Sequence, residues 1–556
     1  MDWTKVLSAC TTVFYVAASY SLTDPDIWVA KITGGPPVAQ LIATVYGYQL
    51  LDKWHLVDDT YLLKKINSSS ARKRTTGKLV KNKRVEWVEK QVPKKRSKRG
   101  IFSWLQSRYR RVFNDELWDK EWYIDPEISY DFNENDMDPT PRYDNSGTNS
   151  HGTKCAGEIS MTANNHVCGV GIAYQASLGG IKILDGPPTD LLESSALGYK
   201  MDKIDVFSNS WGPADDGKAM DEPGRLLTKV LYKGITEGRN GKGIIYIFAS
   251  GNGKFHGDNC GADGYINSIF TVPVASASQE GKAVYYGERC AAIMATAYSS
   301  GSPRNEMIAT TNLNNSCTVR HSGTSAAAPL AAGIAALVLQ ANPELTWRDF
   351  QHLIAWTSEV AVLGANPDWI LNGAGYWVNR NFGFGLLNAF KLVTMARQMK
   401  TVPSKSICII PIKLRGNTTL VKGSEVNVRI YTTGCEGMQN EINFLEHVEL
   451  KLSVKYPRRG SLSVYLTSPS GTPSIMLEER FKDSATSGLR GWTMSTVHCW
   501  GENPRGIWTV TVRTRENEEE DYIAYVGEIT SALVRLHGTK IMPLHYEFGP
   551  RKYEPL

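Results

Sequence analysis

A run of small and apolar residues between positions 324 and 341 restricts most strongly what this chain can fold into. Thr324-Ser325-Ala-Ala-Ala-Pro is followed by LAAGIAALVLQ, an Ala-rich composition that predicts a helix. Ser325 stands at the start of that helix, where backbone N–H groups and the helix dipole favour developing negative charge. The sequence therefore predicts a serine hydroxyl at a helix N-terminus, which is a suitable position for a nucleophile.

A serine needs a base to take its proton and a donor to hold the oxyanion, and the chain offers a candidate for each role. His151-Gly-Thr-Lys-Cys-Ala-Gly places a histidine among small residues, and Ala-Ser-Gly-Asn252-Gly places a side-chain amide after the apolar run GIIYIF. Each motif alone is better explained as an ordinary turn or helix start. Together, in the order His151, Asn252, Ser325, they form a consistent set for nucleophilic catalysis.

This order of motifs resembles the subtilisin-like serine proteases, in which the catalytic residues follow the order Asp, His, Ser. The segments SNSWGPADDGK, NPELTWRDFQHL and NFGFGLLNA, with the Ser325 block, resemble the proprotein convertases of the kexin and furin type, and most of all the neuroendocrine convertase 1 branch. The resemblance covers nearly the whole chain. It implies an α/β protease domain with a parallel sheet, a small α/β prodomain, and a C-terminal β-sandwich or barrel called the P domain.

The length and charge of the chain agree with a protein of several globular domains. A chain of 556 residues is too long for one core and predicts two to four domains. The net charge of +6 hides a local excess, since eighteen Lys or Arg stand against two Glu between Lys64 and Arg111. A solvated basic face or a nucleic-acid patch would not explain why these residues cluster in pairs, and no base-reading motif accompanies them. No nucleic-acid partner is therefore expected.

The first 21 residues, MDWTKVLSACTTVFYVAASYS, predict a signal peptide, with a short buried helix as the alternative. Nine cysteines and three Asn-X-Ser/Thr sequons favour secretion. We expect the lumen of the secretory pathway, in the trans-Golgi network or in secretory granules, or release from the cell. No later run reaches 18 apolar residues, so no transmembrane anchor is expected. The candidate glycosylation sites are Asn67, Asn314 and Asn417.

Four segments are expected after the signal peptide. Residues 22–99 resemble the convertase propeptide, which packs on the protease and holds it inactive. The protease motifs lie in residues 100–403, alternating strands with Gly, Pro and Ser turns in residues 404–539, and a short tail in residues 540–556. Two basic clusters resemble propeptide cleavage sites that the enzyme itself would cut: the primary site ends at Arg99 and an internal one at Arg74.

The chain departs from the family between Tyr123 and Ile124. A convertase continues there through an apolar strand that presents the triad Asp, whereas Tyr123 runs directly into a segment that resembles the part beyond that strand. Asp185 and Asp215 both match other family positions, so neither replaces the missing carboxylate. In a Ser–His–Asp site this carboxylate orients the His and stabilises the imidazolium, and its loss in subtilisin costs about 10⁴ in turnover. The sequence predicts a protease domain that lacks the triad Asp and one buried strand.

The resemblance implies calcium as the cofactor, held at three sites by oxygen ligands. Without it, the Asp-rich loop before position 140 would be explained first as a solvated acidic turn. One site would use Asp131, Asp136 and Asp138. Another would use Asp115 with Asn165, Val167 and Gly169, and a third Asp215, Asp258 and Glu288.

Cleavage after basic residues requires carboxylates around their side chains, because a guanidinium prefers to pair with two oxygens. By resemblance, Asp215 and Asp263 line the site for the residue at the cleaved bond, and Glu193 and Asp221 meet an Arg three residues upstream. The family places an acidic residue just before its catalytic His, facing the second basic side chain, and this chain has Thr148 there. Preference for a basic residue at that second position is open.

The resemblance also implies three disulfides among the nine cysteines. Cys155, beside His151, is expected to be a free, buried, structural thiol, and Cys10 and Cys499 have no evident partner. The implied pairs are Cys168–Cys317, Cys260–Cys290 and Cys408–Cys435.

Two functions remain as alternatives. The first is a calcium-dependent serine endopeptidase that processes secretory precursors and prohormones after paired basic residues; its partners would be precursors with dibasic sites and its own propeptide. In that enzyme Ser325 attacks the carbonyl, His151 moves the proton, and Asn252 with the Ser325 N–H holds the oxyanion. The second is a catalytically inactive secreted isoform, or an incomplete gene model, that binds propeptides or partner convertases. The Tyr123–Ile124 junction is the feature that separates them.

Overall fold

The structure is a computed structural model of the whole chain, and it describes the following residues: 22, 24, 26–66, 79–99, 126–143, 149–302, 304–414, 416, 418–515, 526–548 and 551–553. The signal peptide and the predicted residues Asn67, Arg74, Asp115, Thr148 and Asn417 lie outside these ranges. The chain divides into two compact units, one that ends at Pro93 and also includes Asn133–Asn135, and one that contains the rest from Lys94 onward.

The first unit is a small antiparallel sheet covered by a helix. Its strands are β1 (Ile27–Ile32), β2 (Tyr48–Trp54), β3 (Thr60–Lys65) and β4 (Val85–Lys90), in the order β2-β3-β1-β4. Gly34 and Gly35 have φ angles of 112° and 82°, which side chains rarely adopt, and they turn the chain from β1 into helix α1 (Pro36–Val45). The helix buries Ala39, Ile42 and Ala43. This unit is the expected small α/β prodomain.

The second unit contains a four-stranded parallel sheet in the order β12-β11-β10-β8. Its strands are β8 (Val206–Asn209), β10 (Ile245–Ala249), β11 (Thr271–Ala277) and β12 (Ala295–Tyr298). Every residue of β10 and β11 is buried, as in a parallel sheet covered on both faces.

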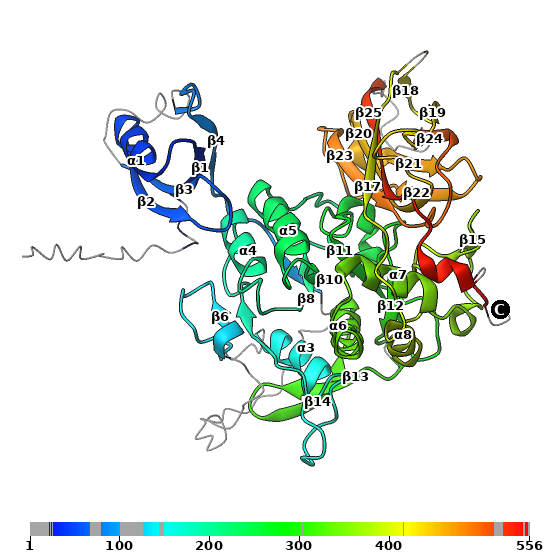
Figure 1. Cartoon of the computed structure of the whole chain (residues 1–556), viewed down its shortest axis with the longest axis horizontal. Coiled ribbons are helices and arrows are strands. Elements are labelled where there is room, and N and C mark those ends of the chain that lie inside the picture. The colour runs from blue at the N-terminus through cyan, green and yellow to red at the C-terminus, as the bar shows by residue number, and fades with distance from the viewer. Residues whose placement is uncertain are drawn as a thin grey trace, which may run out of the picture. The chain divides into compact units, whose positions relative to one another are not determined.

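Helices pack around this sheet (Figure 1). Helix α6 (Thr324–Ala341) packs on all four strands and against α3 (Ser150–Ser160) and α8 (Ala389–Ala396). Helices α4 (Asp190–Leu197) and α5 (Arg225–Glu237) pack together, and the Tyr246 hydroxyl of β10 donates a hydrogen bond to Leu197 O. Helix α6 is the helix in the described chain that is long and apolar enough to cross a membrane, and most of it is buried inside the protein. Its small side chains therefore serve close packing at the centre of the protease domain.

Strand β8 has a ladder partner on one side only within the described residues, namely β10. Strands β6 (Tyr130–Asp131) and β7 (Ile181–Lys182) form a separate parallel pair. The loss of a strand from this domain stays a prediction. Such a loss would leave the partly buried β8 paired on one side only.

Shorter elements connect the sheet to the predicted site. Strands β13 (Ile308–Asn312) and β14 (Ser316–His321) form a hairpin that ends just before Ser325, and β13 packs against α3. Strand β5 (Ser97–Lys98) pairs with β9 (Trp211–Gly212), and β15 (Ile370–Leu371) pairs with β16 (Trp377–Val378).

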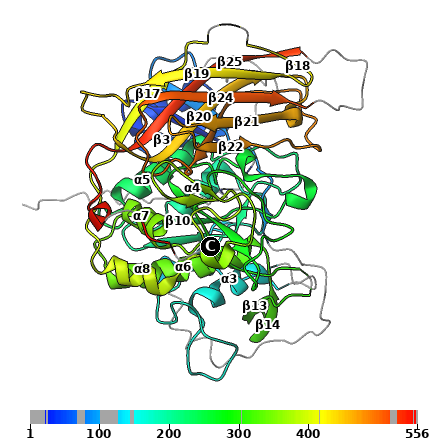
Figure 2. The ribbon, with the colours of Figure 1, turned by 90° about the vertical axis from the view of Figure 1, so that its right-hand side faces the viewer.

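The P domain is a sandwich of two antiparallel sheets. The alternating strands in the sequence had left both a β-sandwich and a barrel open. Figure 2 shows the strands of both sheets packed together at one end of this unit. One sheet has the order β17-β25-β20-β23, with β18 also on β25, and the other has the order β19-β24-β21-β22. The strands are β17 (Ser406–Pro411), β18 (Thr419–Val421), β19 (Glu425–Thr432), β20 (Phe444–Lys455), β21 (Leu462–Thr467), β22 (Pro473–Leu477), β23 (Leu489–Thr496), β24 (Gly506–Thr514) and β25 (Val526–Thr539).

Buried polar contacts join the P domain to the protease domain. Helix α7 (Trp347–Thr357) presents His352, whose Nε2 lies 3.0 Å from the Glu446 carboxylate. The Arg480 Nε donates to Asp258 Oδ1 at 3.0 Å, and the Trp492 indole donates to Gly261 O at 2.9 Å. Because these groups are buried, separating the two domains would leave charges and donors unpaired.

Candidate active site

Residues Lys94 to Arg99, which end at the predicted primary cleavage site, lie against the protease domain as an extended strand. Ser97 and Lys98 pair antiparallel with Gly212 and Trp211. The ladder continues at its end, where Arg99 N donates to Ser210 O at 3.1 Å. The tail is thus held by backbone hydrogen bonds, in the way that an added strand extends a sheet.

The carbonyl oxygen of Arg99 lies between the two donors that the sequence predicted for the oxyanion. It accepts hydrogen bonds from the Asn252 side-chain amide and, at 3.3 Å, from Ser325 N. The Asn252 Oδ1 in turn accepts from Thr324 N at 2.9 Å, which turns the amide nitrogen toward the carbonyl. Gly323 has a φ of 87°, and a Cβ there would press on Arg99 O. Backbone at the start of α6 therefore approaches the carbonyl closely because residue 323 is glycine.

The Arg99 side chain is buried among acidic groups, which we call the Arg99 site. Its guanidinium is paired with Asp263, donates to Ala249 O, and has its Nε 3.7 Å from Asp215 Oδ1. Burial opposes the charge, but Asp263, Asp215 and Glu288 together raise the pKa of Arg99 above its ordinary value. Both residues predicted for the first position, Asp215 and Asp263, are therefore brought to this arginine.

The Arg96 side chain occupies a second acidic site, which we call the Arg96 site. Its guanidinium donates to Glu193 Oε1 at 2.6 Å, to Asp221 Oδ2 at 2.7 Å, and to the Tyr265 hydroxyl at 2.7 Å. The Tyr265 hydroxyl donates in turn to Glu193 Oε2 at 2.6 Å. Glu193 and Asp221 were predicted here; Tyr265 was not, and no signal in the sequence marks it.

Among the other basic residues of the tail, Lys94 has its amine 3.6 Å from the buried Glu193 carboxylate, whereas Lys98 and Lys95 have more open partners. The Lys98 amine donates to Asn149 Oδ1 at 3.2 Å, beside the position of Thr148. Lys95 lies 3.7 Å from Asp216, and both side chains are exposed. An exposed pair of this kind contributes about 1 kcal/mol or less. Selectivity in the tail is therefore concentrated at Arg96 and Arg99.

His151 and Ser325 lie in the same region but are not hydrogen-bonded to each other. The Ser325 hydroxyl donates to Ser210 O at 3.4 Å, while the Nε2 of His151 has no hydrogen-bond partner among the described residues. Burial, with Lys98 and Lys154 adding to it, lowers the pKa of His151 to about 3. No carboxylate in the described ranges is paired with this ring. Among the described residues, the imidazolium that proton transfer would create thus has no partner of the kind that a Ser–His–Asp site supplies.

Cys155 is a free thiol beside His151, as expected, but it is half-buried and not fully buried. Its Sγ lies 4.0 Å from His151 Nδ1 and 3.6 Å from Ser325 O. Burial raises the pKa of this thiol to about 12, so it is protonated at neutral pH. Cys499 is also free and buried. Neither thiol is activated as a nucleophile.

Of the three predicted calcium sites, Asp215, Asp258 and Glu288 form the set that best fits a cation. Burial, and then the other acidic groups, raises the pKa of Glu288 well above its ordinary value, and the pKa of Asp258 is raised to about 6 chiefly by burial. Asp258 accepts from Gly217 N and Arg480, and Glu288 accepts from Gly253 N at 2.9 Å. In addition to burial, Asp215 raises the pKa of Asp258, and both raise the pKa of Glu288, so these buried carboxylates are a suitable donor set for a hard cation.

The other two predicted sets lie around Asp131 and around Asn165. The Asp131 carboxylate is paired with Lys182 at 2.7 Å, and Asp136 and Asp138 accept hydrogen bonds from amides of their own loop. In the exposed loop of the last set, Asn165 Oδ1 accepts from Val167 N at 3.0 Å, with Gly169 two residues further on. Asp115 lies outside the described residues.

The cysteine pairs and one sequon can also be placed. Disulfides join Cys168 to Cys317, Cys260 to Cys290 and Cys408 to Cys435, the pairs that the resemblance implied. Asn314 is exposed in the turn of the β13–β14 hairpin, with a φ of 63°. An exposed turn leaves room for a glycan.

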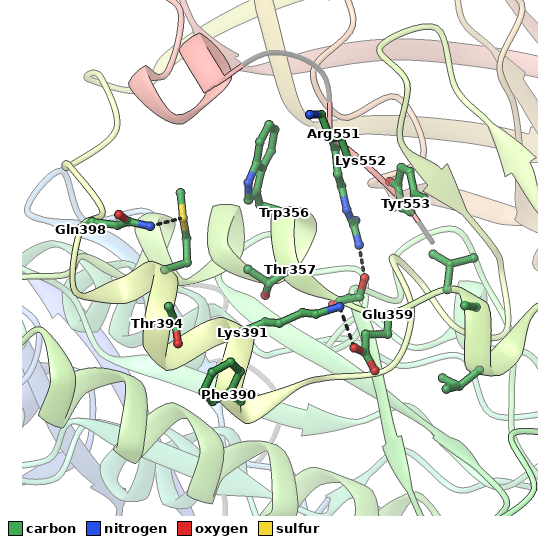
Figure 3. A pocket seen from close by; sticks show the side chains of 15 residues that line it. Trp356, Thr357, Glu359, Phe390, Lys391, Thr394, Gln398, Arg551, Lys552 and Tyr553 are labelled. Carbon is green, nitrogen blue, oxygen red and sulfur yellow. Dashed lines mark hydrogen bonds and ion pairs between the residues drawn. The ribbon is translucent and has the colours of Figure 1, made fainter. Parts of the chain in front are cut away.

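A cavity of about 440 Å³ lies away from these groups (Figure 3). It is bounded by Trp356, Lys391 and the segment from Arg551 to Tyr553. Lys391 is paired with Glu359 at 2.8 Å, and Arg551 donates to backbone carbonyls at the end of α7. Its charged groups are thus already engaged in holding the fold.

The buried parallel sheet, with a serine at the start of α6 and two donors on one carbonyl, defines the class of subtilisin-like serine proteases. Residues 77–385 match the Subtilase family, residues 27–99 match the Peptidase S8 pro-domain, and residues 445–525 match the Proprotein convertase P-domain. The chain belongs to the subtilisin-like proprotein convertase family.

Individual relatives agree with this assignment. The chain is 40% identical to Furin-1 of Xenopus laevis over 562 residues, which cover 94% of this chain and 70% of that protein. It is 39% identical to Furin of Rattus norvegicus, covering 92% and 68% of the two chains, and 39% identical to Proprotein convertase subtilisin/kexin type 6 of Homo sapiens, covering 93% and 58%. In its fold it is similar to the Aeromonas sobria serine protease solved with its chaperone ORF2, with a TM-score of 0.65 and 20% identity over 74% of this chain and 84% of that chain.

Proposed function

We propose that this chain is a calcium-dependent serine endopeptidase that cleaves precursor proteins of the secretory pathway after paired basic residues. The observation that carries the proposal is the position of its own tail, with Arg99 and Arg96 in two acidic sites and the Arg99 carbonyl on Asn252 and Ser325 N. A precursor with the pattern Arg-X-Lys-Arg would make the same contacts. The tail is in this view both the first substrate and an inhibitor.

The chemistry follows from these positions. The Ser325 hydroxyl turns from Ser210 O to His151 and attacks the Arg99 carbonyl carbon while His151 takes its proton. The Asn252 amide and Ser325 N hold the resulting oxyanion, and each such donor is worth about 10²–10³ in rate. His151 then returns the proton to the leaving amine, and water releases the acyl group by the reverse sequence.

Calcium is proposed as the cofactor, held best by Asp215, Asp258 and Glu288. When bound there, it would supply charge that allows three buried carboxylates to stay ionised. Asp215 would then be available to pair with the arginine in the Arg99 site. The sets around Asp131 and Asn165 are proposed as additional sites.

Finer assignments also belong to the proposal. The motifs quoted above favour the neuroendocrine convertase 1 branch, with prohormones among the substrates. A secretory location, either luminal or extracellular, is supported by the three disulfides and by the exposed turn that holds Asn314. Glycans at Asn67 and Asn417 and cleavage after Arg74 are proposed on sequence alone.

A second function is favoured by a specific observation, the absence of any carboxylate paired with His151 in the described chain. A protein of this kind would bind basic tails in the Arg96 and Arg99 sites without cutting them. It would act as an inactive isoform that sequesters propeptides or associates with active convertases.

Expression in cells that lack their own convertases separates the two functions. The peptide that spans Arg99 is analysed by mass spectrometry, beside a matched Ser325→Ala chain. Cleavage in the first chain and not in the second supports the endopeptidase. An intact junction in both, with the protein folded and secreted, overturns it and favours the binding function.

A further inference from the structure

His151, Cys155 and His321 form a group of metal-ligating side chains that the proposed catalysis uses only in part. Their candidate ligand atoms all lie within 4.8 Å of one another, and the two imidazole rings have centroids 5.7 Å apart. Among the described residues, it is the one group of three or more His, Cys, Asp or Glu side chains with all ligand atoms within 4.8 Å of one another.

The backbone holds these side chains together without help from an ion. His151 and Cys155 are one turn apart on α3, so they share a face of the helix. His321 ends strand β14, and the hairpin that contains it is fastened to α3 by hydrogen bonds from Thr310 and Thr311 to carbonyls of that helix, at 2.7 and 2.8 Å. The three ligands therefore come from two elements in fixed contact.

Several polar atoms in the group are buried and lack partners. His321 is 3% exposed; its Nδ1 is hydrogen-bonded to the Glu158 carboxyl group, but its Nε2 has no partner among the described residues. The same is true of the second Glu158 oxygen and of His151 Nε2, and Cys155 is a free thiol. Buried polar groups are rarely left unsatisfied, so this arrangement points to a missing ligand.

We propose that His151, Cys155 and His321 bind a divalent cation of intermediate softness, for which Zn²⁺ is the probe. Two imidazoles and a thiolate are a common ligand set for zinc, with ligand atoms about 3.4–3.6 Å apart in a tetrahedral site. In the present structure the ligand atoms are up to 4.8 Å apart, so the side chains would have to rotate closer on binding. Calcium, which binds oxygen ligands, does not compete for this set.

The surroundings provide the outer contacts of such a site. Glu158 would accept from His321 Nδ1–H, which leaves Nε2 for the metal, as in many carboxylate–histidine–zinc arrangements. Binding of the ion would displace the Cys155 proton to solvent, and the resulting thiolate, with the Glu158 carboxylate, would offset the two positive charges of the ion. Lys98 and Lys154 act electrostatically on His151 and oppose a cation. Removal of the tail that carries Lys98 should therefore strengthen binding.

The consequence for activity rests on the function proposed above. An ion on His151 would prevent this ring from taking the proton of Ser325. Zinc would then inhibit the protease reversibly, through a residue that catalysis cannot dispense with.

The test uses the full chain with Ser325→Ala, which keeps the tail intact, in saturating calcium so that oxygen sites remain filled. Cobalt(II) is titrated as a spectroscopic probe and then displaced by zinc. One equivalent of cobalt should produce a thiolate-to-metal charge-transfer band and the visible bands of a four-coordinate ion. Cys155→Ser should abolish the charge-transfer band, Glu158→Gln should weaken zinc binding by about 10–100-fold, and the matched control Cys499→Ser should leave both unchanged.

A spectrum without the thiolate band, or a band that persists in Cys155→Ser, would overturn the inference. Because a variant can misfold, zinc-edge X-ray absorption on the chain with native Cys155 provides a second measurement. One sulfur and two imidazoles around zinc support the site, and a shell of oxygen and nitrogen alone refutes it. Neither measurement needs proteolysis, so a chain that never cuts at Arg99 would refute the proposed function and still decide the metal site.

Discussion

The Tyr265 hydroxyl offers the sharpest test of how the basic tail is recognised. It accepts a hydrogen bond from the Arg96 guanidinium at 2.7 Å and donates one to Glu193 at 2.6 Å. A hydrogen bond to a charged group contributes about 1.5–3 kcal/mol. Tyr265→Phe should therefore weaken the hold on Arg96 by that amount, which corresponds to about 10- to 150-fold in an opening equilibrium.

Hydrogen exchange of residues 94–99, measured by mass spectrometry in the Ser325→Ala chain, reports this opening without any catalysis. Tyr265→Phe should accelerate exchange of the segment by the stated factor. In an Arg96→Met background the same substitution should have almost no further effect, since its partner is already gone. The control is Tyr246→Phe, which removes a buried hydroxyl that is bonded to Leu197 O and not to the tail. Equal acceleration in both backgrounds, or none in either, would refute the role given to Tyr265.

Three further predictions concern the oxyanion donors, the domain interface and pH. Gly323→Ala should slow cleavage at Arg99 by about 10²-fold or more, because the added Cβ would press on the Arg99 carbonyl oxygen. The matched control is Gly375→Ala, at a φ of 82° with open space around its Cβ. An equal loss of cleavage in both variants would show that backbone strain, and not the contact with Arg99, is responsible. In calcium-free buffer, Arg480→Met should lower the free energy of thermal unfolding by about 3–5 kcal/mol, because it leaves Asp258 buried without a cation. Arg513→Met, from a pair 52% and 39% exposed, should lower it by about 1 kcal/mol or less. Burial, followed by nearby positive groups, lowers the pKa of His447 to about 3, so between about pH 3 and 6.5 the unfolded chain binds more protons at this residue than the folded chain. The unfolding temperature should therefore fall as the pH drops from about 6.5 to about 3. His447→Gln should make the unfolding temperature depend less on pH in this range.

The need for carboxylates around basic side chains could be predicted from charge alone. The particular residues Glu193, Asp221 and Asp263 came from the resemblance to the proprotein convertases, because a charge requirement does not say which acidic residues meet it. Tyr265 was not predicted, because a tyrosine near an apolar run is usually a core residue, and only the fold reveals that its hydroxyl bridges Arg96 and Glu193. Polar contacts made by nominally hydrophobic residues are what sequence reasoning misses here.

Long-range pairings were harder to predict than local elements. Strand alternation after position 404 predicted the P-domain strands, but the choice of a sandwich depends on how β20 and β25 pair, which no local pattern encodes. The spacing of His151 and Cys155 by one helical turn was visible in the sequence, while His321 joins them only because the β13–β14 hairpin packs on α3. The hydroxyl of Ser325 turned to Ser210 O, away from His151, is likewise a property of the packed structure.

The extended conformation of the tail along β9 has a consequence for which bonds can be cut. Three residues of strand span about 10 Å and three residues of helix only about 4.5 Å. Side chains three positions apart also point to opposite sides of a strand but to one side of a helix. An arginine pair spaced like Arg96 and Arg99 can reach both acidic sites only from an unwound chain. Under the proposed function, a precursor that keeps its dibasic motif inside a helix would be protected, and the folding of the substrate would become part of the selectivity.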